Sequence, residues 1–331
     1  MFSKAVLQLD IPVTIGKIAE TLRAQVMGVL HKRGVVVGLS GGIDSSVVAA
    51  LAVRALGKER VLGLFMPEKD SSDDSLRLGQ LVAGELGINT VTESIGAALA
   101  ALGCYERQNE ALRRLVPDFA AGWRFKLALP SIMDGPVNSA GARLNVTQLT
   151  VQKPNGETQT QRMPIDVYLQ IVAATNYKQR VRKMTEYYHG DRLNYAVTGT
   201  PNRLEYDQGF FVKQGDGAAD VKPIAHLYKT QVYDLAGQVG VPAAILDAVP
   251  TTDTYSLPQT QEEFYFRFPL RTLDLLVYAS ANGVAPADAA AAVGLEPDDV
   301  ERVYADLDAK RRVARRNLAD AVLAEPPEPR P

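Results

Sequence analysis

The chain has 331 residues, of which 46% are hydrophobic and 22% charged, and its formal net charge is −2. This composition is ordinary for a folded protein, and it gives no global basic field that would attract nucleic acid. The single cysteine, Cys104, excludes an internal disulfide framework and a Cys-rich zinc site, and it favours a buried structural thiol. No apolar run approaches the roughly 20 residues of a membrane span or the core of a signal peptide, so we expect no membrane association and a cytoplasmic location.

The first hundred residues predict alternating helices and strands. In chain order we expect a helix over 14–32, a strand over 34–39, a helix over 47–56, a strand over 60–67, a helix over 75–86 and a strand over 88–93. This order predicts a parallel, doubly wound α/β sheet with helices on both faces. Ligands bind such sheets beyond the carboxyl ends of the strands.

Residues from about 105 to 165 interrupt this order. Residues 144–151 alternate like a strand, Pro154-Asn155-Gly156 is a strong turn signal, and 158–163 is expected to return antiparallel. We therefore predict an inserted β-hairpin. It would either cover a substrate or build a subunit interface, and the pattern does not choose between these roles.

The α/β order resumes after the insertion, and the C-terminal part is helical. The expected elements are a helix over 176–188, a strand over 195–200, and helices over 229–240, 287–293 and 297–324. We predict one α/β domain over 1–258 with the insertion, a helical extension of it over 259–324, and a disordered proline-rich tail over 325–331.

The run Ser40-Gly41-Gly42-Ile43-Asp44-Ser45-Ser46 links the first strand to the following helix. Its glycines let backbone N–H groups approach phosphate oxygens, and Ser45 and Ser46 add hydroxyl donors at a helix start. Asp44 would repel a bare phosphate, which suggests a bridging divalent cation. The lysine-containing P-loop is absent, and the run resembles the PP-loop of the ATP pyrophosphatases.

Three later blocks carry further chemistry. The segment 199–205 ends a strand and places a carboxylate, Glu205, in the turn that follows. The segment 209–220 combines three glycines with Lys213, Asp216 and Asp220. The segment 223–232 places Lys229 at a helix start, where a cation is unfavourable unless an anion meets it.

Together with Met66-Pro67-Glu68-Lys69-Asp70-Ser71-Ser72 and Asn176-Tyr177-Lys178-Gln179-Arg180-Val181-Arg182, these blocks closely resemble the NAD synthetase family. The resemblance covers about 15–100 and 175–250. It implies a Rossmann-like sheet of the adenine nucleotide alpha hydrolase type, within the PP-loop ATP pyrophosphatase superfamily. It also implies a reaction in two steps. A substrate carboxylate first attacks ATP, which forms an acyl-adenylate and releases pyrophosphate. Ammonia then attacks the acyl-adenylate, so that deamido-NAD becomes NAD and AMP is released.

The resemblance also implies roles for individual residues. Asp44 and Glu205 match Mg²⁺ ligands, Asp44 and Lys229 are expected to act in catalysis, and Asp216 is a candidate to deprotonate ammonium. The positions that match ATP-binding residues are Ser40, Gly41, Gly42, Ser45, Ser46, Thr200, Lys229 and Thr251. The positions that match residues binding the deamidated dinucleotide are Arg180, Lys213 and Asp220.

Simpler roles compete with several of these assignments. Arg180 and Arg182 could be solvated on a helix face, Lys213 could be a loop cation, and Glu205 could cap a helix locally. For His226, structural or surface placement is favoured over a general base.

The match weakens after Thr251. The family carries an aspartate where this chain has Gln261, and an aromatic run follows. A PP-loop amide ligase that adenylates another acid is therefore the alternative function, and a catalytically silent nucleotide-binding protein is a third reading. We expect no fused glutaminase domain, so the ammonia is expected to be free or delivered by a separate glutaminase. The resemblance also implies a homodimer.

Overall fold

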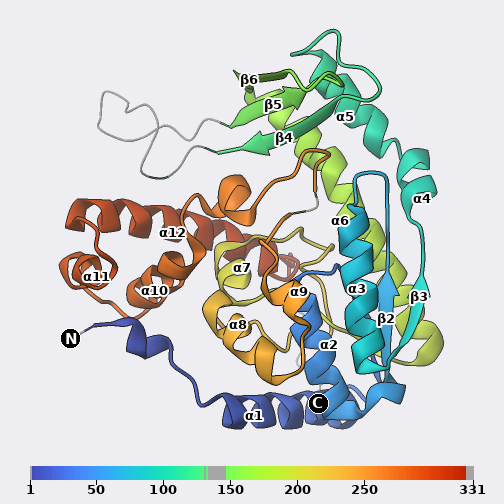
Figure 1. The fold of residues 1–331 in the computed structure, drawn as a ribbon, viewed down its shortest axis with the longest axis vertical. Helices are drawn as coiled ribbons and strands as arrows, with labels where there is room; N and C mark the ends of the chain where they lie inside the picture. The colour runs from blue at the N-terminus through green and yellow to red at the C-terminus, as the bar shows by residue number, and fades with distance from the viewer. Residues whose placement is uncertain (1, 130–131, 133–146, 253, 326–331) are drawn as a thin grey trace.

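A four-stranded parallel sheet forms the centre of the protein (Figure 1). The computed structural model describes residues 2–129, 132, 147–252 and 254–325. The strand order is β3-β2-β1-β7, with bounds Asn89–Thr92, Val61–Phe65, Val35–Gly38 and Ala196–Val197. The expected parallel order of the first three strands is confirmed, with Val35 opposite both Val61 and Ala196.

Helices cover both faces of this sheet, which confirms the doubly wound arrangement. Along β1, Val35 and Val37 pack into a core that also holds residues of α1, α2 and α8, whereas Val36 packs with residues of α4 and α6 on the other face. These helices span Ile11–Arg23, Ile43–Leu56, Lys229–Gln238, Gly96–Ala101 and Ile165–Leu193. Burial on both faces explains why the strand is continuously apolar rather than alternating.

The insertion is larger than the predicted hairpin. The hairpin itself is present as β5 (Gln148–Gln152) and β6 (Thr158–Arg162), with Gly156 in the left-handed region at its turn. A third strand, β4 (Arg124–Ala128), pairs antiparallel with β5 and was not predicted. Residues 144–146 of the expected strand lie outside the described residues.

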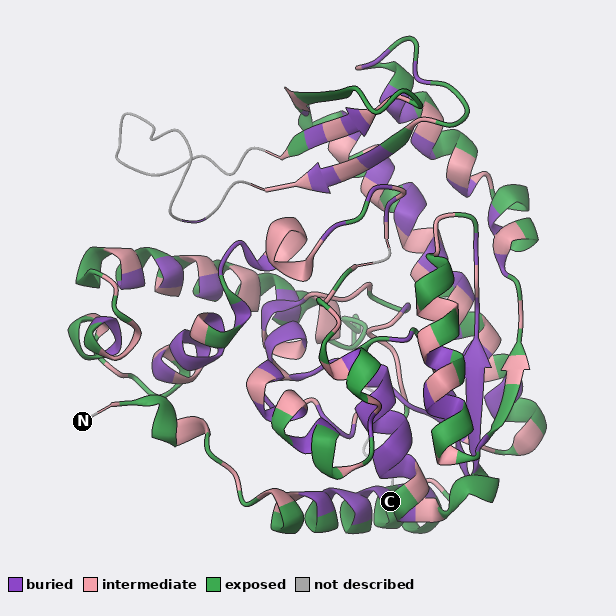
Figure 2. Cartoon of the chain, in the orientation of Figure 1, coloured by how far each residue is buried: buried purple, intermediate pink, exposed green. Residues whose placement is uncertain are grey.

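Alternate residues of β4 and β5 are buried against helix α6 (Figure 2). Helix α5 (Cys104–Arg113) also packs on α6, and Cys104 is a buried free thiol as expected. The insertion therefore has an apolar face that rests on the same long helix that supports the parallel sheet.

Three helices, α10 (Leu270–Ala281), α11 (Pro286–Val293) and α12 (Pro297–Leu318), make the C-terminal part. They share an apolar core with Leu204 of α7 (Arg203–Gln208) and with Tyr228. Helix α12 ends six residues before the expected Ala324. The division at residue 258 stays a prediction, and of the expected tail only Glu325 is among the described residues.

Element lengths differ from the sequence expectations in three further places. Helix α1 gives way to a π-helical turn, η2 (Ala24–Val29), and α6 begins at Ile165 rather than near residue 176. Strand β7 is short because the chain leaves the sheet after Thr198 pairs with Val221. The remaining elements are η1 (Lys4–Leu7), η3 (Lys58–Arg60), α3 (Asp73–Leu86), α9 (Ala243–Leu246) and the π-helix η4 (Glu262–Phe266). Among the described helices, none has the length and apolarity needed to cross a membrane.

Candidate active site

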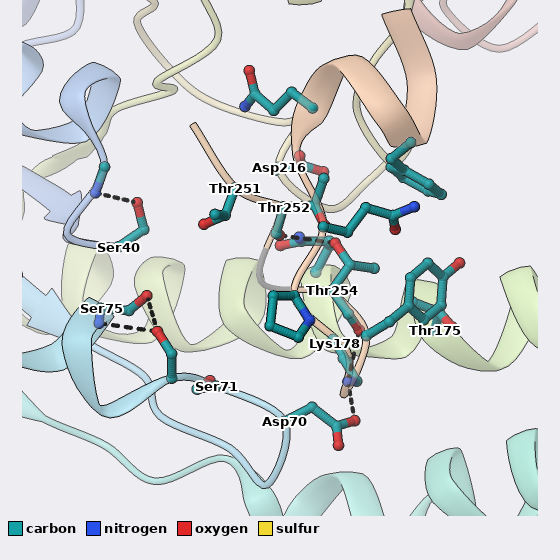
Figure 3. Close-up of a pocket in the computed structure, with 18 of the residues that line it drawn as sticks. Ser40, Asp70, Ser71, Ser75, Thr175, Lys178, Asp216, Thr251, Thr252 and Thr254 are labelled. Carbon is teal, nitrogen blue, oxygen red and sulfur yellow. Dashed lines mark hydrogen bonds and ion pairs between the residues drawn. The ribbon is translucent and has the colours of Figure 1, made fainter. Parts of the chain in front are cut away.

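A cavity of 1490 Å³ opens beyond the carboxyl ends of the parallel strands. Figure 3 shows Ser40, Thr251 and Asp216 around it. The sequence-predicted site residues that line it are Ser40, Gly41, Gly42, Asp44, Ser45, Arg180, Thr200, Glu205, Lys213, Asp216, Lys229 and Thr251. Ser46 and Asp220 are described but are not among its lining residues. The fold thus brings most of the predicted site together from segments far apart in the sequence.

The loop from Ser40 to Ser45 is tightly fitted between β1 and α2. Gly41 has a φ of +77°, and a Cβ there would lie 2.4 Å from the Ser75 carbonyl oxygen of α3, so only glycine fits. The Ser45 hydroxyl donates to the Gly42 carbonyl at 3.0 Å, and the Ser40 N–H donates to the Ser45 oxygen at 3.3 Å. The Ser46 hydroxyl also donates to Gly42, at 2.8 Å, and the residue is 1% exposed. Ser46 therefore holds the helix start, and its contact with ATP stays a prediction.

Asp44, Glu205 and Lys229 meet at the base of the cavity. One Asp44 carboxylate oxygen forms an ion pair with the Lys229 ammonium, and the other accepts a hydrogen bond of 3.0 Å from the Asn202 side-chain amide. Asn202 is the N-cap of α7, and its backbone N–H donates to Glu205 Oε2 at 3.2 Å. The sequence reasoning missed Asn202, which orients both carboxylates, and it correctly weighed a capping role for Glu205.

Burial strongly affects the charges of this group. Burial, reinforced by the neighbouring Asp44, raises the pKa of Glu205 to about 8. For Lys229, burial acts to lower the pKa, but the carboxylates of Asp44 and Glu205 outweigh it and the pKa is raised. An added cation would relieve the repulsion between the two carboxylates.

The donor set fits Mg²⁺ in one specific way. Among the described residues, no three His, Cys, Asp or Glu side chains converge on a common point. Mg²⁺ is commonly held by one or two carboxylates together with substrate phosphates, so Asp44 and Glu205 suffice only when a phosphate completes the shell.

The glycine-rich loop over 209–220 brings Asp216 and Lys213 to the cavity. The Asp216 carboxylate accepts a hydrogen bond of 2.7 Å from the Val212 N–H, and burial raises its pKa. Lys213 is exposed, and its carbonyl accepts a bond of 3.3 Å from Arg180 Nε, which joins the loop to α6. Asp220 is exposed and accepts bonds from the Val197 N–H and the Tyr187 hydroxyl. It stabilises the end of β7, and its role in dinucleotide binding stays a prediction.

A buried ion cluster was missed at the sequence level. Lys178 of α6 is 1% exposed, and its ammonium lies 3.0 Å from Glu68 Oε1. The ammonium also lies 2.6 Å from Asp70 Oδ2 (Figure 3). The same ammonium donates to the Thr254 carbonyl at 3.0 Å. Burial acts to raise the pKa of Glu68, but Lys178 outweighs it and the pKa is lowered. Lys178 therefore joins the β2–α3 loop to the segment that follows Thr251.

The segment after Thr251 also touches the carboxylate group. Thr251 pairs with Thr260 in an antiparallel bridge, and the Gln261 amide donates to Glu205 Oε1 at 3.1 Å. The residue that departs from the expected family pattern is thus a direct neighbour of a predicted metal ligand. His226 is exposed and is not among the cavity residues, in agreement with the surface placement favoured above.

The model of the NAD synthase family matches residues 14–120 and 141–314. The chain belongs to this family. A relative from Mesorhizobium japonicum, named NH(3)-dependent NAD(+) synthetase, is 59% identical over 93% of this chain and 95% of its own length. A relative of the same name from Rhizobium meliloti is 53% identical over 99% of this chain and 96% of its own length.

Solved structures of the same type share the fold. An NH3-dependent NAD synthetase from Campylobacter jejuni superposes with a TM-score of 0.60 at 20% identity, over 96% of this chain and all of that one. An NMN synthetase from Francisella tularensis gives a TM-score of 0.58 at 21% identity, over 96% and 99% of the two chains. NAD synthase family membership agrees with the resemblance seen in the sequence, and these structures support the α/β architecture.

Proposed function

We propose that this protein is an ammonia-dependent NAD synthase that amidates the carboxylate of deamido-NAD at the expense of ATP. The observation that carries the proposal is the meeting of Asp44, Glu205 and Lys229 beside the Ser40–Ser45 loop, at the carboxyl end of the sheet. The names of the relatives at 59% and 53% identity support the same activity.

In the first step, a carboxylate oxygen of deamido-NAD attacks the α-phosphorus of ATP. The new O–P bond forms as the bond to the β-phosphate breaks, which leaves an acyl-adenylate and pyrophosphate. Backbone N–H groups of the Ser40–Ser45 loop hold the leaving pyrophosphate, and Lys229 neutralises its charge. For this, Lys229 exchanges its ion pair with Asp44 for contact with a phosphate.

Asp44 and Glu205 would hold Mg²⁺, which when bound offsets the negative charge of the phosphates. The raised pKa of Glu205 favours the protonated carboxyl near neutral pH in the free protein. The carboxyl releases that proton when a positive charge arrives beside it.

In the second step, ammonia attacks the acyl carbon, and AMP leaves with the carboxylate oxygen that bonded to phosphorus. Ammonia is mostly ammonium near neutral pH, so a base must remove a proton before attack. Asp216 lines the cavity and has a raised pKa, which suits it for this role. Arg180 and Lys213 provide positive charge for the dinucleotide's pyrophosphate.

The alternative, a ligase for a different acid, is not favoured by the relatives' names. The structural similarity to an NMN synthetase is at 21% identity and concerns the fold alone. The homodimer, the separate glutaminase and the cytoplasmic location stay predictions.

The test is product analysis by mass spectrometry after incubation with ATP, Mg²⁺, ammonium and deamido-NAD. NAD, AMP and pyrophosphate in equal amounts would agree with the proposal. Formation of ADP, or AMP release that depends on another carboxylic acid and not on deamido-NAD, would contradict it. The variant D44N is the control for trace contaminating enzyme.

A further inference from the structure

A carboxylate that the proposed reaction does not use is buried in the C-terminal helices. Asp274 of α10 is 0% exposed, and its neighbours Leu273 and Leu276 are buried as well. A carboxylate in apolar surroundings costs free energy unless hydrogen bonds or opposite charges compensate for the loss of water. The contacts of Asp274 therefore indicate what this side chain does.

Asp274 accepts a hydrogen bond from the start of α8. Its Oδ2 atom accepts from the Thr230 N–H at 2.7 Å, although 44 positions separate the two residues in the sequence. Thr230 directly follows Lys229, the first residue of α8. In Figure 1 α10 lies beside α8, and the two helices are in contact. Asp274 thus caps α8 from a neighbouring helix, at the residue next to Lys229.

The first turn of α8 has two features that favour such a cap. Its N-cap residue is Tyr228, which has a phenol in place of the short oxygen-bearing side chains that usually accept from the first N–H groups of a helix. Lys229 also brings a positive charge to the positive end of the helix dipole, which is unfavourable. The carboxylate of Asp274 offsets both, because it accepts a hydrogen bond and carries the opposite charge.

The charges of Asp274 and Lys229 support each other. Burial raises the pKa of Asp274 to about 6, whereas hydrogen bonding by Thr230 and the charge of Lys229 act to lower it. The effect is reciprocal, so the ionised Asp274 also favours the charged form of Lys229. Lys229 is itself 2% exposed, so its charge depends on such neighbours.

Helix α10 also reaches the carboxylate group by a second route. The Leu270 N–H at the start of α10 donates to Glu262 Oε1 at 2.8 Å. Glu262 directly follows Gln261, whose amide donates to Glu205. One helix of the C-terminal part therefore holds both the backbone beside Lys229 and the segment beside Glu205.

We propose that Asp274 is a positioning residue for Lys229, and that the C-terminal helices contribute to the reaction with ATP through it. This rests on the proposed function. Lys229 has to leave Asp44 and meet the pyrophosphate as the bond between the α- and β-phosphates breaks. Because Asp274 holds the backbone next to Lys229, only the lysine side chain moves in this exchange. Without Asp274, the first turn of α8 can shift and the ammonium is misplaced for the leaving group.

The variant D274N keeps the shape of the side chain and removes its charge. The assay is single-turnover release of pyrophosphate from ATP with deamido-NAD at pH 8, where Asp274 is ionised. The rate should fall about 10-fold or more, the size expected for loss of a hydrogen bond to a charged group. The KM for ATP should stay nearly unchanged, because Lys229 pairs with Asp44 until the phosphate bond breaks. An unchanged rate, or a rise in KM alone, would overturn the proposal.

The variant V277A separates positioning from a loss of stability. Val277 is fully buried on the same helix, in the core that α10 shares with α11 and α12. V277A should lower the melting temperature and leave the rate of pyrophosphate release unchanged. Equal slowing by V277A and D274N would overturn the proposal, because the effect would then follow stability. If D274N does not fold, D274L fits the apolar surroundings without a charge, and the same slowing is expected from it.

Calorimetry with Mg²⁺ and inorganic pyrophosphate is the second measurement, and it needs no acid substrate. D274N should weaken pyrophosphate binding about 10-fold when Lys229 is present and have no effect in the K229M background, because Asp274 acts through Lys229. Equal affinities of wild type and D274N, or an equal loss in both backgrounds, would overturn the proposal. If the wild type made no NAD, the proposed function would fail, and this comparison would still decide whether Asp274 positions Lys229.

Discussion

The buried carboxyl of Glu205 should make the free energy of unfolding depend on pH. Its pKa is raised from an ordinary value of 4.5 to about 8, and its residue is 9% exposed. A carboxyl whose folded-state pKa is raised binds its proton more tightly in the folded protein. Its contribution to stability is therefore fully present below pH 4.5 and is lost as the pH rises through 8.

The variant E205Q removes this titration and keeps the shape of the side chain. Each pH unit in the window is worth about 1.4 kcal/mol, so the full span from 4.5 to 8 corresponds to about 5 kcal/mol. Relative to wild type, E205Q should gain stability steadily from pH 5 to pH 8 and then level off. NAD formation should be lost at every pH, because a predicted metal ligand is gone.

Urea unfolding of both proteins at one-unit steps from pH 5 to pH 9 gives the difference directly. E301Q, on the exposed face of α12, is the matched control and should show no pH-dependent difference. A second variant, D44N, removes a charge that raises the pKa of Glu205, so it should move the loss of stability to lower pH. A constant difference between E205Q and wild type from pH 5 to pH 9 would refute the reasoning.

The other predictions concern the loop, the ion cluster and catalysis. G41A should destabilise the protein by more than the roughly 1–2 kcal/mol of a left-handed alanine, because its Cβ would meet the Ser75 carbonyl at 2.4 Å. G294A, also left-handed but with open space around the Cβ, is its control, and equal losses in urea unfolding would count against the close fit. K178M should lower the free energy of unfolding by about 3–5 kcal/mol, since Glu68 and Asp70 lose their counter-charge. The control K58M, at an exposed lysine, should change the free energy of unfolding little. Equal melting temperatures for K178M and K58M would contradict this prediction. D44N should slow pyrophosphate release about 100-fold or more. Unchanged turnover would show that Asp44 has no role in the reaction with ATP.

The phosphate loop could be predicted from sequence because its determinants are local. An apolar β-branched run, two glycines and a helical pattern follow one another within about 20 residues, and the structure places β1, the loop and α2 there. The position of Glu205 near Asp44 could not be derived from the residues, because 160 residues separate them and only the sheet topology brings them together. The family resemblance supplied that link.

Other features lacked a clear local signal. Strand β4 is five residues long and carries two charges, so its alternation is weak evidence until β5 lies beside it. Lys178 stands two residues from Arg180 in a polar stretch of α6 and resembles a solvated cation, although it is buried. Asn202 did carry a signal, since an Asn three residues before a Glu is the pattern of a capping box.

The central claim is that the substrate carboxylate attacks the α-phosphate of ATP at the Ser40–Ser45 loop. It is tested most directly with deamido-NAD whose carboxylate carries ¹⁸O. Mass spectrometry of the products should find one ¹⁸O atom in the phosphate of AMP and the other in the amide of NAD. AMP without the label, or label in pyrophosphate or inorganic phosphate, would contradict the acyl-adenylate and the site described for it.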